Sequence, residues 1–162
     1  MFESIRVIGG PLRPSSAADV KAAETQLGVR FPTGYREYVT RFGEGVLGGA
    51  YIRIYPPHRI LAGPNNVGEW RERIREYWQW EEAGRVLTKQ EALEGVIIGD
   101  TVAGDELVVH PSNPDRIMVL PHDSETIYVA GNGLQAVIEW LCGSGTLTDP
   151  FDERDFEPFN SK

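Results

Sequence analysis

The chain has 162 residues, of which 41% are hydrophobic and 10% aromatic, and it carries 24 Asp plus Glu against 16 Lys plus Arg. This length suits one compact domain with an ordinary core, and the aromatic content excludes a disordered acidic chain. The apolar runs are far shorter than the ~20 residues of a membrane span. Because acidic residues outnumber basic ones, the composition argues against direct contact with nucleic-acid phosphates.

The net charge of -8 is divided unevenly along the chain. Residues 1–81 hold 11 basic and 9 acidic residues, a net of +2, whereas residues 82–162 hold 5 basic and 15 acidic residues, a net of -10. Two explanations fit this asymmetry: solubility, or an acidic face for a cationic partner. On charge alone, solubility is the simpler explanation.

The N-terminal part of the sequence predicts two short helices. Ser16 with Asp19 forms a capping-box pattern, apolar residues follow at helical spacing, and Gly28 is placed to end the helix. Pro32 suits the start of a second helix, whose apolar positions continue to Phe42. Because the connection between them is short, we expect the two helices to pack as a hairpin.

The remainder of the sequence predicts strands, a middle helix and a final helix. Strand patterns cover residues 50–55, 96–98, 106–110, 116–120 and 126–129, and helical spacing covers residues 67–82 and 134–142. Strands joined by turns form an antiparallel sheet, so the predicted class is α+β: an N-terminal helical hairpin packed on an antiparallel sheet, with a middle and a C-terminal helix. We expect a single domain over residues 1–162, with residues 149–162 as an acidic surface tail.

No catalytic, cofactor or metal motif is present in a suitable context. Residues 43–48 match G-x-G-x-x-G, but a helix enters and a strand leaves, the reverse of the dinucleotide-binding order. The three histidines and Cys142 lack zinc-ligand spacing, so we expect no metal and no cofactor. With one cysteine, no internal disulfide and no secretory signal pattern, the expected compartment is the cytoplasm.

The carboxylates around residues 100–106 allow a remote alternative, a small carboxylate-dependent hydrolase. Aspartate in a turn more often accepts backbone N–H bonds, which favours a structural role. Trp80 lies outside the apolar stripe of the predicted middle helix. It is therefore expected either to anchor an exposed interface or to pack against a loop.

The first helical pair resembles a known family. Its pattern, Glu24-x-x-Leu27-Gly28-Val29-x-Phe31-Pro32-x-x-Tyr35-x-x-Tyr38 closed by glycines from Gly43, is similar to the signature of the Smi/Knr family in the SUKH superfamily of immunity proteins. The hairpin over residues 98–106 and the closing helix through Trp140 and Leu141 resemble other recurrent elements of that family. The resemblance implies a non-enzymatic α+β binding domain. Bacterial relatives neutralise toxin domains, many of them nucleases, and fungal relatives act as hubs in cell-wall regulation.

The leading hypothesis is therefore a cytoplasmic immunity protein that binds and neutralises a cationic bacterial toxin, with a nuclease as the expected target. A nuclease presents a cationic cleft to phosphate, and an acidic protein can fill that cleft with fast, steered association. The alternative is a regulatory scaffold of the Smi/Knr type that binds endogenous proteins. The predicted partner-binding residues are Asp100, Asp105, Glu106, Asp123, Glu125, Asp152, Glu153, Asp155 and Trp80.

Overall fold

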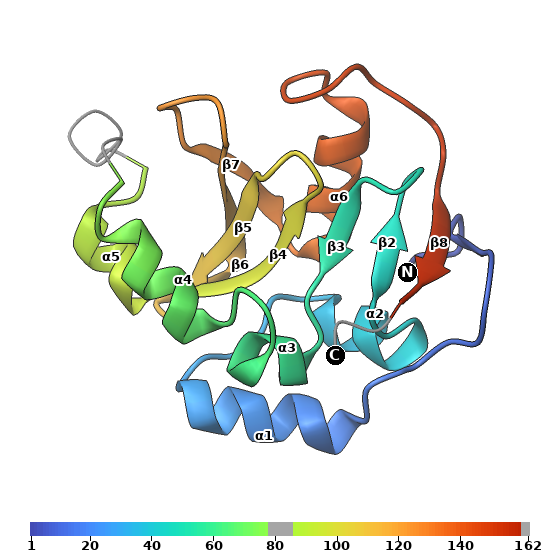
Figure 1. Ribbon diagram of the computed structural model, residues 1–162, viewed down its shortest axis with the longest axis horizontal. Coiled ribbons are helices and arrows are strands. Elements are labelled where there is room, and N and C mark those ends of the chain that lie inside the picture. Colours follow the sequence, from blue (N-terminus) through green and yellow to red (C-terminus); the bar gives the residue numbers. More distant parts are fainter. Residues whose placement is uncertain (78–85, 160–162) are drawn as a thin grey trace.

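A mostly antiparallel sheet forms the centre of the computed structural model, which describes residues 1–77 and 86–159. Over these residues the sheet has eight strands in the order β1-β8-β2-β3-β4-β5-β6-β7 (Figure 1). Among the strand pairs of residues 1–77 and 86–159, only β1–β8 is parallel. The strands are β1 (Arg6–Val7), β2 (Gly45–Leu47), β3 (Ile52–Ile54), β4 (Val96–Thr101), β5 (Glu106–His110), β6 (Asn113–Leu120), β7 (Tyr128–Asn132) and β8 (Asp155–Pro158).

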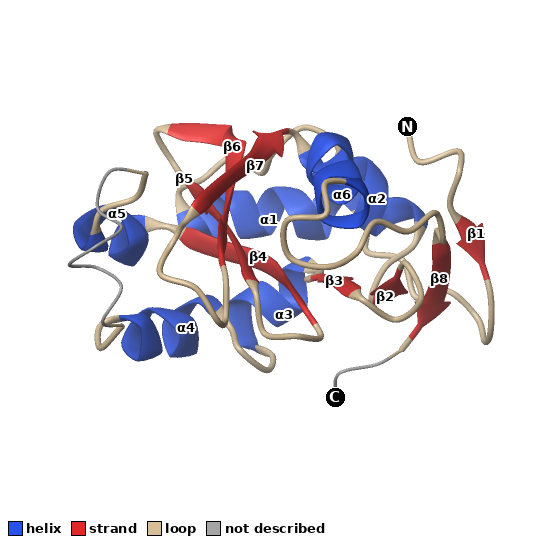
Figure 2. Cartoon of the chain, turned by 90° about the horizontal axis from the view of Figure 1, so that it is seen from above, coloured by secondary structure: helices blue, strands red, loops and turns tan. Residues whose placement is uncertain are grey.

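Helices cover the sheet and one of its ends. They are α1 (Ala17–Leu27), α2 (Tyr35–Arg41), α3 (Pro57–Ala62), α4 (Val67–Ile74), α5 (Lys89–Glu94) and α6 (Leu134–Gly143). Helices α3 and α4 lie along one face and contact β4, whereas α6 packs against β6 and β7 (Figure 2). Helix α1 contacts α2 and α3 at one end of the sheet (Figure 1). The α+β class is thus confirmed.

The N-terminal helices form for the local reasons that their sequence indicates. The Ser16 hydroxyl accepts the Asp19 N–H at 3.0 Å, and the Asp19 carboxylate accepts the Ser16 N–H at 3.4 Å, which completes a capping box. Gly28 adopts φ 64°, a left-handed conformation that ends α1 at little steric cost. The Phe31 ring stacks on Tyr35 at 4.2 Å between centroids and fixes the entry into α2.

Two short helices and a helix end differ from the prediction. Pro57, for which no helix was predicted, is the first residue of α3, because proline suits the first helical turn. Helix α5 begins at a second capping box, formed by Thr88 and Glu91. The middle helix ends at Ile74, since the Tyr77 N–H bonds to the Ile74 carbonyl at 3.1 Å and tightens the chain into a turn.

Strand β8 occupies part of the segment that we expected to be a surface tail. Asp149, Asp152 and Glu153 are exposed, but β8 pairs with β1 on one side and β2 on the other. Phe156 is fully buried, with its ring centroid 5.2 Å from that of Phe42. Residues 155–158 therefore belong to the sheet, because burying Phe156 favours strand pairing over solvation.

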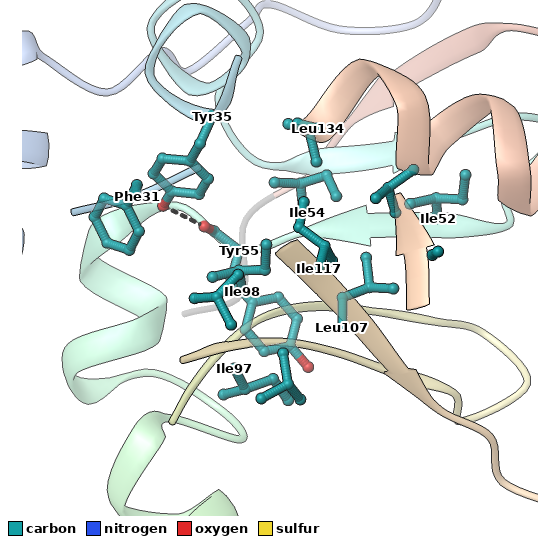
Figure 3. Packing of buried hydrophobic residues seen from close by; sticks show 14 of the residues in the cluster. Phe31, Tyr35, Ile52, Ile54, Tyr55, Ile97, Ile98, Leu107, Ile117 and Leu134 are labelled. Atoms are coloured by element: carbon teal, nitrogen blue, oxygen red, sulfur yellow. Dashed lines mark hydrogen bonds between the residues drawn. The ribbon is translucent and has the colours of Figure 1, made fainter. Parts of the chain in front are cut away.

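The buried hydrophobic side chains form one cluster around the sheet. Ile52 and Ile54 of β3 meet Leu107, Ile117 and the α6 residue Leu134 on one face (Figure 3). The helical end is joined to this core by the Tyr35 hydroxyl, which donates to the Tyr55 carbonyl at 2.6 Å (Figure 3). This bond thus ties α2 to the segment that follows β3.

Candidate functional site

Three of the predicted partner-binding acids are buried in the sheet. Asp100 on β4 is 7% exposed, Glu106 on β5 is 5% exposed, and Asp105 in the turn between them is 6% exposed. Asp100 and Glu106 are direct register partners across β4 and β5. Two carboxylates placed opposite one another repel, so each needs its own cation.

Arg53 supplies the cation for Asp100. These residues are register partners across β3 and β4, and the Arg53 guanidinium donates to both carboxylate oxygens, at 2.6 and 3.0 Å. The Tyr55 hydroxyl donates to Asp100 at 2.6 Å. Burial, together with the nearby Asp100 charge, raises the pKa of Tyr55 well above its ordinary range, so the phenol remains a donor.

Helix α4 supplies the cation for Glu106. The Arg73 guanidinium donates to one Glu106 oxygen at 2.5 Å, and the Tyr77 hydroxyl donates to the other at 2.8 Å. Asn65 links the partners of Asp100 to those of Glu106. It donates to the Tyr55 hydroxyl at 3.1 Å and accepts from Arg73 at 2.7 Å. The resulting carboxylate network, made of residues 53, 55, 65, 73, 77, 100 and 106, ties β3, β4 and β5 to α4.

Asp105 connects two loops. Its carboxylate accepts the Thr101 hydroxyl at 2.7 Å and the His122 backbone N–H at 3.0 Å. Gly104 allows this approach, since a Cβ there would lie 3.2 Å from the His122 ring and its φ is +96°. Asp105 therefore holds the β4–β5 turn against the β6–β7 loop, the backbone-capping role that its turn position allows.

The other predicted acids lie nearer the surface. Asp123, Glu125, Asp152 and Glu153 are exposed, whereas Asp155 is half-buried and pairs with Arg6 at 2.9 Å. Trp80 lies outside the described residues. The acids at 123, 125, 152 and 153 belong to two loops that both lie at the top of Figure 1, at the end of the sheet opposite α1.

We call this end the loop end and define it by residues 48–51, 102–105, 121–127 and 143–153. These four segments contain six carboxylate residues and no lysine or arginine. One carboxylate, Asp105, is buried, and the other five are exposed. The loop end is therefore a negatively charged surface supported from below by the carboxylate network.

The sequence did not reveal that these loops share one end of the sheet, or which cations pair with the buried acids. Arg53 and Tyr55 do lie on the same face of the alternating segment at 50–55, and this pattern indicates a polar partner on that face of the sheet. No local pattern links Arg53 to Asp100, or Arg73 to Glu106, because the members of these pairs are 47 and 33 residues apart.

The described residues contain no group of three or more His, Cys, Asp or Glu side chains placed to hold a metal ion. Cys142 is fully buried, and burial raises the pKa of its thiol to about 11, which makes it a poor nucleophile. None of the helices in residues 1–77 and 86–159 has the length and apolar character needed to cross a membrane.

Comparison with known proteins assigns the family. No curated protein gives a significant match to the sequence. A family model described as SMI1 / KNR4 family (SUKH-1) matches residues 14–140, from just before α1 to near the end of α6. The match leaves residues 143–153 of the loop end and β8 outside. Because it spans well over half of the chain, this protein belongs to the SMI1 / KNR4 family (SUKH-1).

Proposed function

We propose that this protein is an immunity protein that binds a bacterial toxin domain through the loop end and blocks its cationic surface. The observation that carries the proposal is the charge of that end: five exposed carboxylates with no lysine or arginine in the same segments. Membership of the SMI1 / KNR4 family supports a protein-binding role of the immunity or Smi/Knr type. The expected toxin is a nuclease, since its active site must attract phosphate.

The rigid base of the loop end also supports docking. Asp105 holds two of the loops together, and the carboxylate network fixes β4 and β5 below them. A surface that is ordered before binding loses less conformational entropy on association. The buried acids thus contribute through positioning, and the exposed acids are the proposed contacts.

The carboxylate pair Asp100 and Glu106 does not support the hydrolase alternative. A pocket of about 400 Å³ is lined by Glu106, Arg73, Tyr77 and His122, so an acid does lie beside a cavity. However, both oxygens of Asp100 accept bonds from Arg53, and both oxygens of Glu106 accept bonds from α4 and the turn after it. Carboxylates held in this way stabilise the fold instead of exchanging protons with a substrate.

Neutralising the exposed acids tests the proposal. The toxin is taken from the gene neighbouring this one, and its association with the protein is measured at low and physiological salt. The loop-end variant carries Asp123→Asn, Glu125→Gln, Asp152→Asn and Glu153→Gln. A control with the same charge change carries Glu37→Gln, Glu72→Gln, Glu94→Gln and Glu157→Gln, which alter exposed acids elsewhere.

We expect the loop-end variant to associate roughly tenfold more slowly than the native protein at low salt, with the control within about threefold. The same variant should lose protection when co-expressed with the toxin. Equal effects of the two variants would show that net charge, and not the loop end, governs binding. If neither co-expression nor affinity capture yields a toxin partner, the immunity role is wrong and the regulatory scaffold replaces it.

A further inference from the structure

The loop end contains a small pocket that the charge argument does not use. Its walls include the turn at residues 48–51, Val102, Phe151 and Glu153, and its volume is about 280 Å³. Pockets for drug-sized ligands are roughly 300–1,000 Å³, so this one suits a single side chain better than a metabolite. Phe151 and Glu153 lie outside the residues matched by the family model.

The walls of the pocket combine apolar and polar surface, and specific contacts hold the aromatic and aliphatic parts in place. The Tyr51 and Phe151 rings meet edge to face at 5.8 Å between centroids. The Val102 N–H donates to the Tyr51 carbonyl at 2.9 Å, and the Phe151 N–H donates to the Cys142 carbonyl at 2.9 Å. Val102 is 55% exposed, so an apolar surface remains open to a partner.

Glycines let Phe151 and Glu153 pack closely against the turn. A Cβ on Gly48 would lie 3.1 Å from the Phe151 ring, and a Cβ on Gly49 would lie 2.7 Å from the Glu153 carboxylate. Both glycines have positive φ, 74° and 66°, which other residues rarely adopt. The two glycines therefore let the Glu153 carboxylate lie beside the Phe151 and Val102 walls of the pocket.

The Glu153 carboxylate is available to a partner. Within residues 1–77 and 86–159 it has no hydrogen-bond or ion-pair partner. The neighbouring cation, Arg154, is bound instead to Glu139 at 3.0 Å and is largely buried. A cation entering the pocket would thus meet an unpaired carboxylate without competition from Arg154.

We propose that this pocket receives one arginine side chain of the partner protein, an inference that rests on the proposed function. The aromatic and valine walls suit the aliphatic part of arginine, and the planar guanidinium can bind the Glu153 carboxylate through two hydrogen bonds. Arginine is enriched among the few residues that carry most of the binding energy of a protein interface. The other exposed acids of the loop end then steer the partner toward the pocket.

The test uses the full chain labelled with ¹⁵N and the probe Nα-acetyl-arginine amide. We expect saturable shifts at the amides of Gly48, Gly49, Tyr51 and Val102, with a dissociation constant in the millimolar range. The corresponding citrulline compound has nearly the same shape without the charge and should bind at least about fivefold more weakly. The lysine compound should also bind more weakly, because it lacks the planar fork.

Two variants assign the effect to one carboxylate. Glu153→Gln should weaken arginine binding about fivefold, while Asp123→Asn, which removes the same charge elsewhere on the loop end, should leave it within about 1.5-fold. Both positions are exposed, and native-like spectra of the variants verify folding. The proposal is overturned by absent saturation, by citrulline binding as well as arginine, or by equal effects of the two variants. Loss of toxin binding in the four-residue loop-end variant would still support the proposed function in that case.

Discussion

Replacing Asp100 with alanine should lower the free energy of unfolding by about 2–3 kcal/mol. The native carboxylate accepts two bonds from Arg53 and one from Tyr55, and its side chain is 10% exposed. Removing one partner of a buried ion pair costs about 3–5 kcal/mol. We expect less because Arg53 retains 31% exposure and can be rehydrated.

The assay is urea unfolding followed by tryptophan fluorescence and far-UV circular dichroism. For a chain of this length the loss corresponds to a fall of about 5–10 °C in Tm. Asp123→Ala is the matched control, because its side chain is 95% exposed and its replacement should change stability by less than about 0.5 kcal/mol. A double-mutant cycle with Arg53→Met should show a coupling of at least about 1 kcal/mol.

The reasoning is refuted if Asp100→Ala is as stable as Asp123→Ala. That result would mean that hydration of Arg53 fully offsets the loss of the ion pair, so that Asp100 does not stabilise the fold. Partner binding also distinguishes a structural role of Asp100 from a role in contacting the partner. Under conditions where it is fully folded, Asp100→Ala should keep its partner affinity within about threefold, whereas a residue in direct charged contact would lose more.

Two further predictions concern the C-terminal half of the chain. Phe156→Ala should lower the free energy of unfolding, measured in urea, by about 3–5 kcal/mol, because the ring is fully buried. The control Glu157→Ala, at an exposed position of the same strand, should be nearly neutral. Similarly small effects of the two substitutions would mean that β8 contributes little to the core. The Cys142 thiol, with its pKa raised to about 11 from 9.0, should resist alkylation at pH 8 in the folded protein. The raised pKa also means that the neutral, buried thiol contributes to the free energy of unfolding. This contribution should be complete below about pH 9 and should be lost as the pH rises toward 11, because the thiol of the unfolded chain ionises at the lower pH. A Cys142→Ala variant should show a correspondingly weaker pH dependence of the urea midpoint, and rapid alkylation of the native protein would contradict the burial argument.

The parts of the fold that the sequence predicted are those with local causes. Helix α1 has its capping box and its terminal glycine within a single stretch of chain, and α6 has a strong apolar spacing. The β4–β5 hairpin joins neighbouring segments through a short turn. Helix α5 was also predictable, because Thr88 and Glu91 have the capping-box spacing that we recognised at Ser16.

The sequence by itself determined the α+β class, the acidic excess of the second half and the family resemblance. Only the tertiary structure decided which acids are available to a partner. Strands β1, β2 and β8 have two to four residues, too few for a periodic pattern, so their pairing depends on distant segments. Asp100 and Glu106 look like surface acids until Arg53 and Arg73 are brought beside them. Burial and charge pairing are properties of neighbours in space, and chain folding alone sets those neighbours.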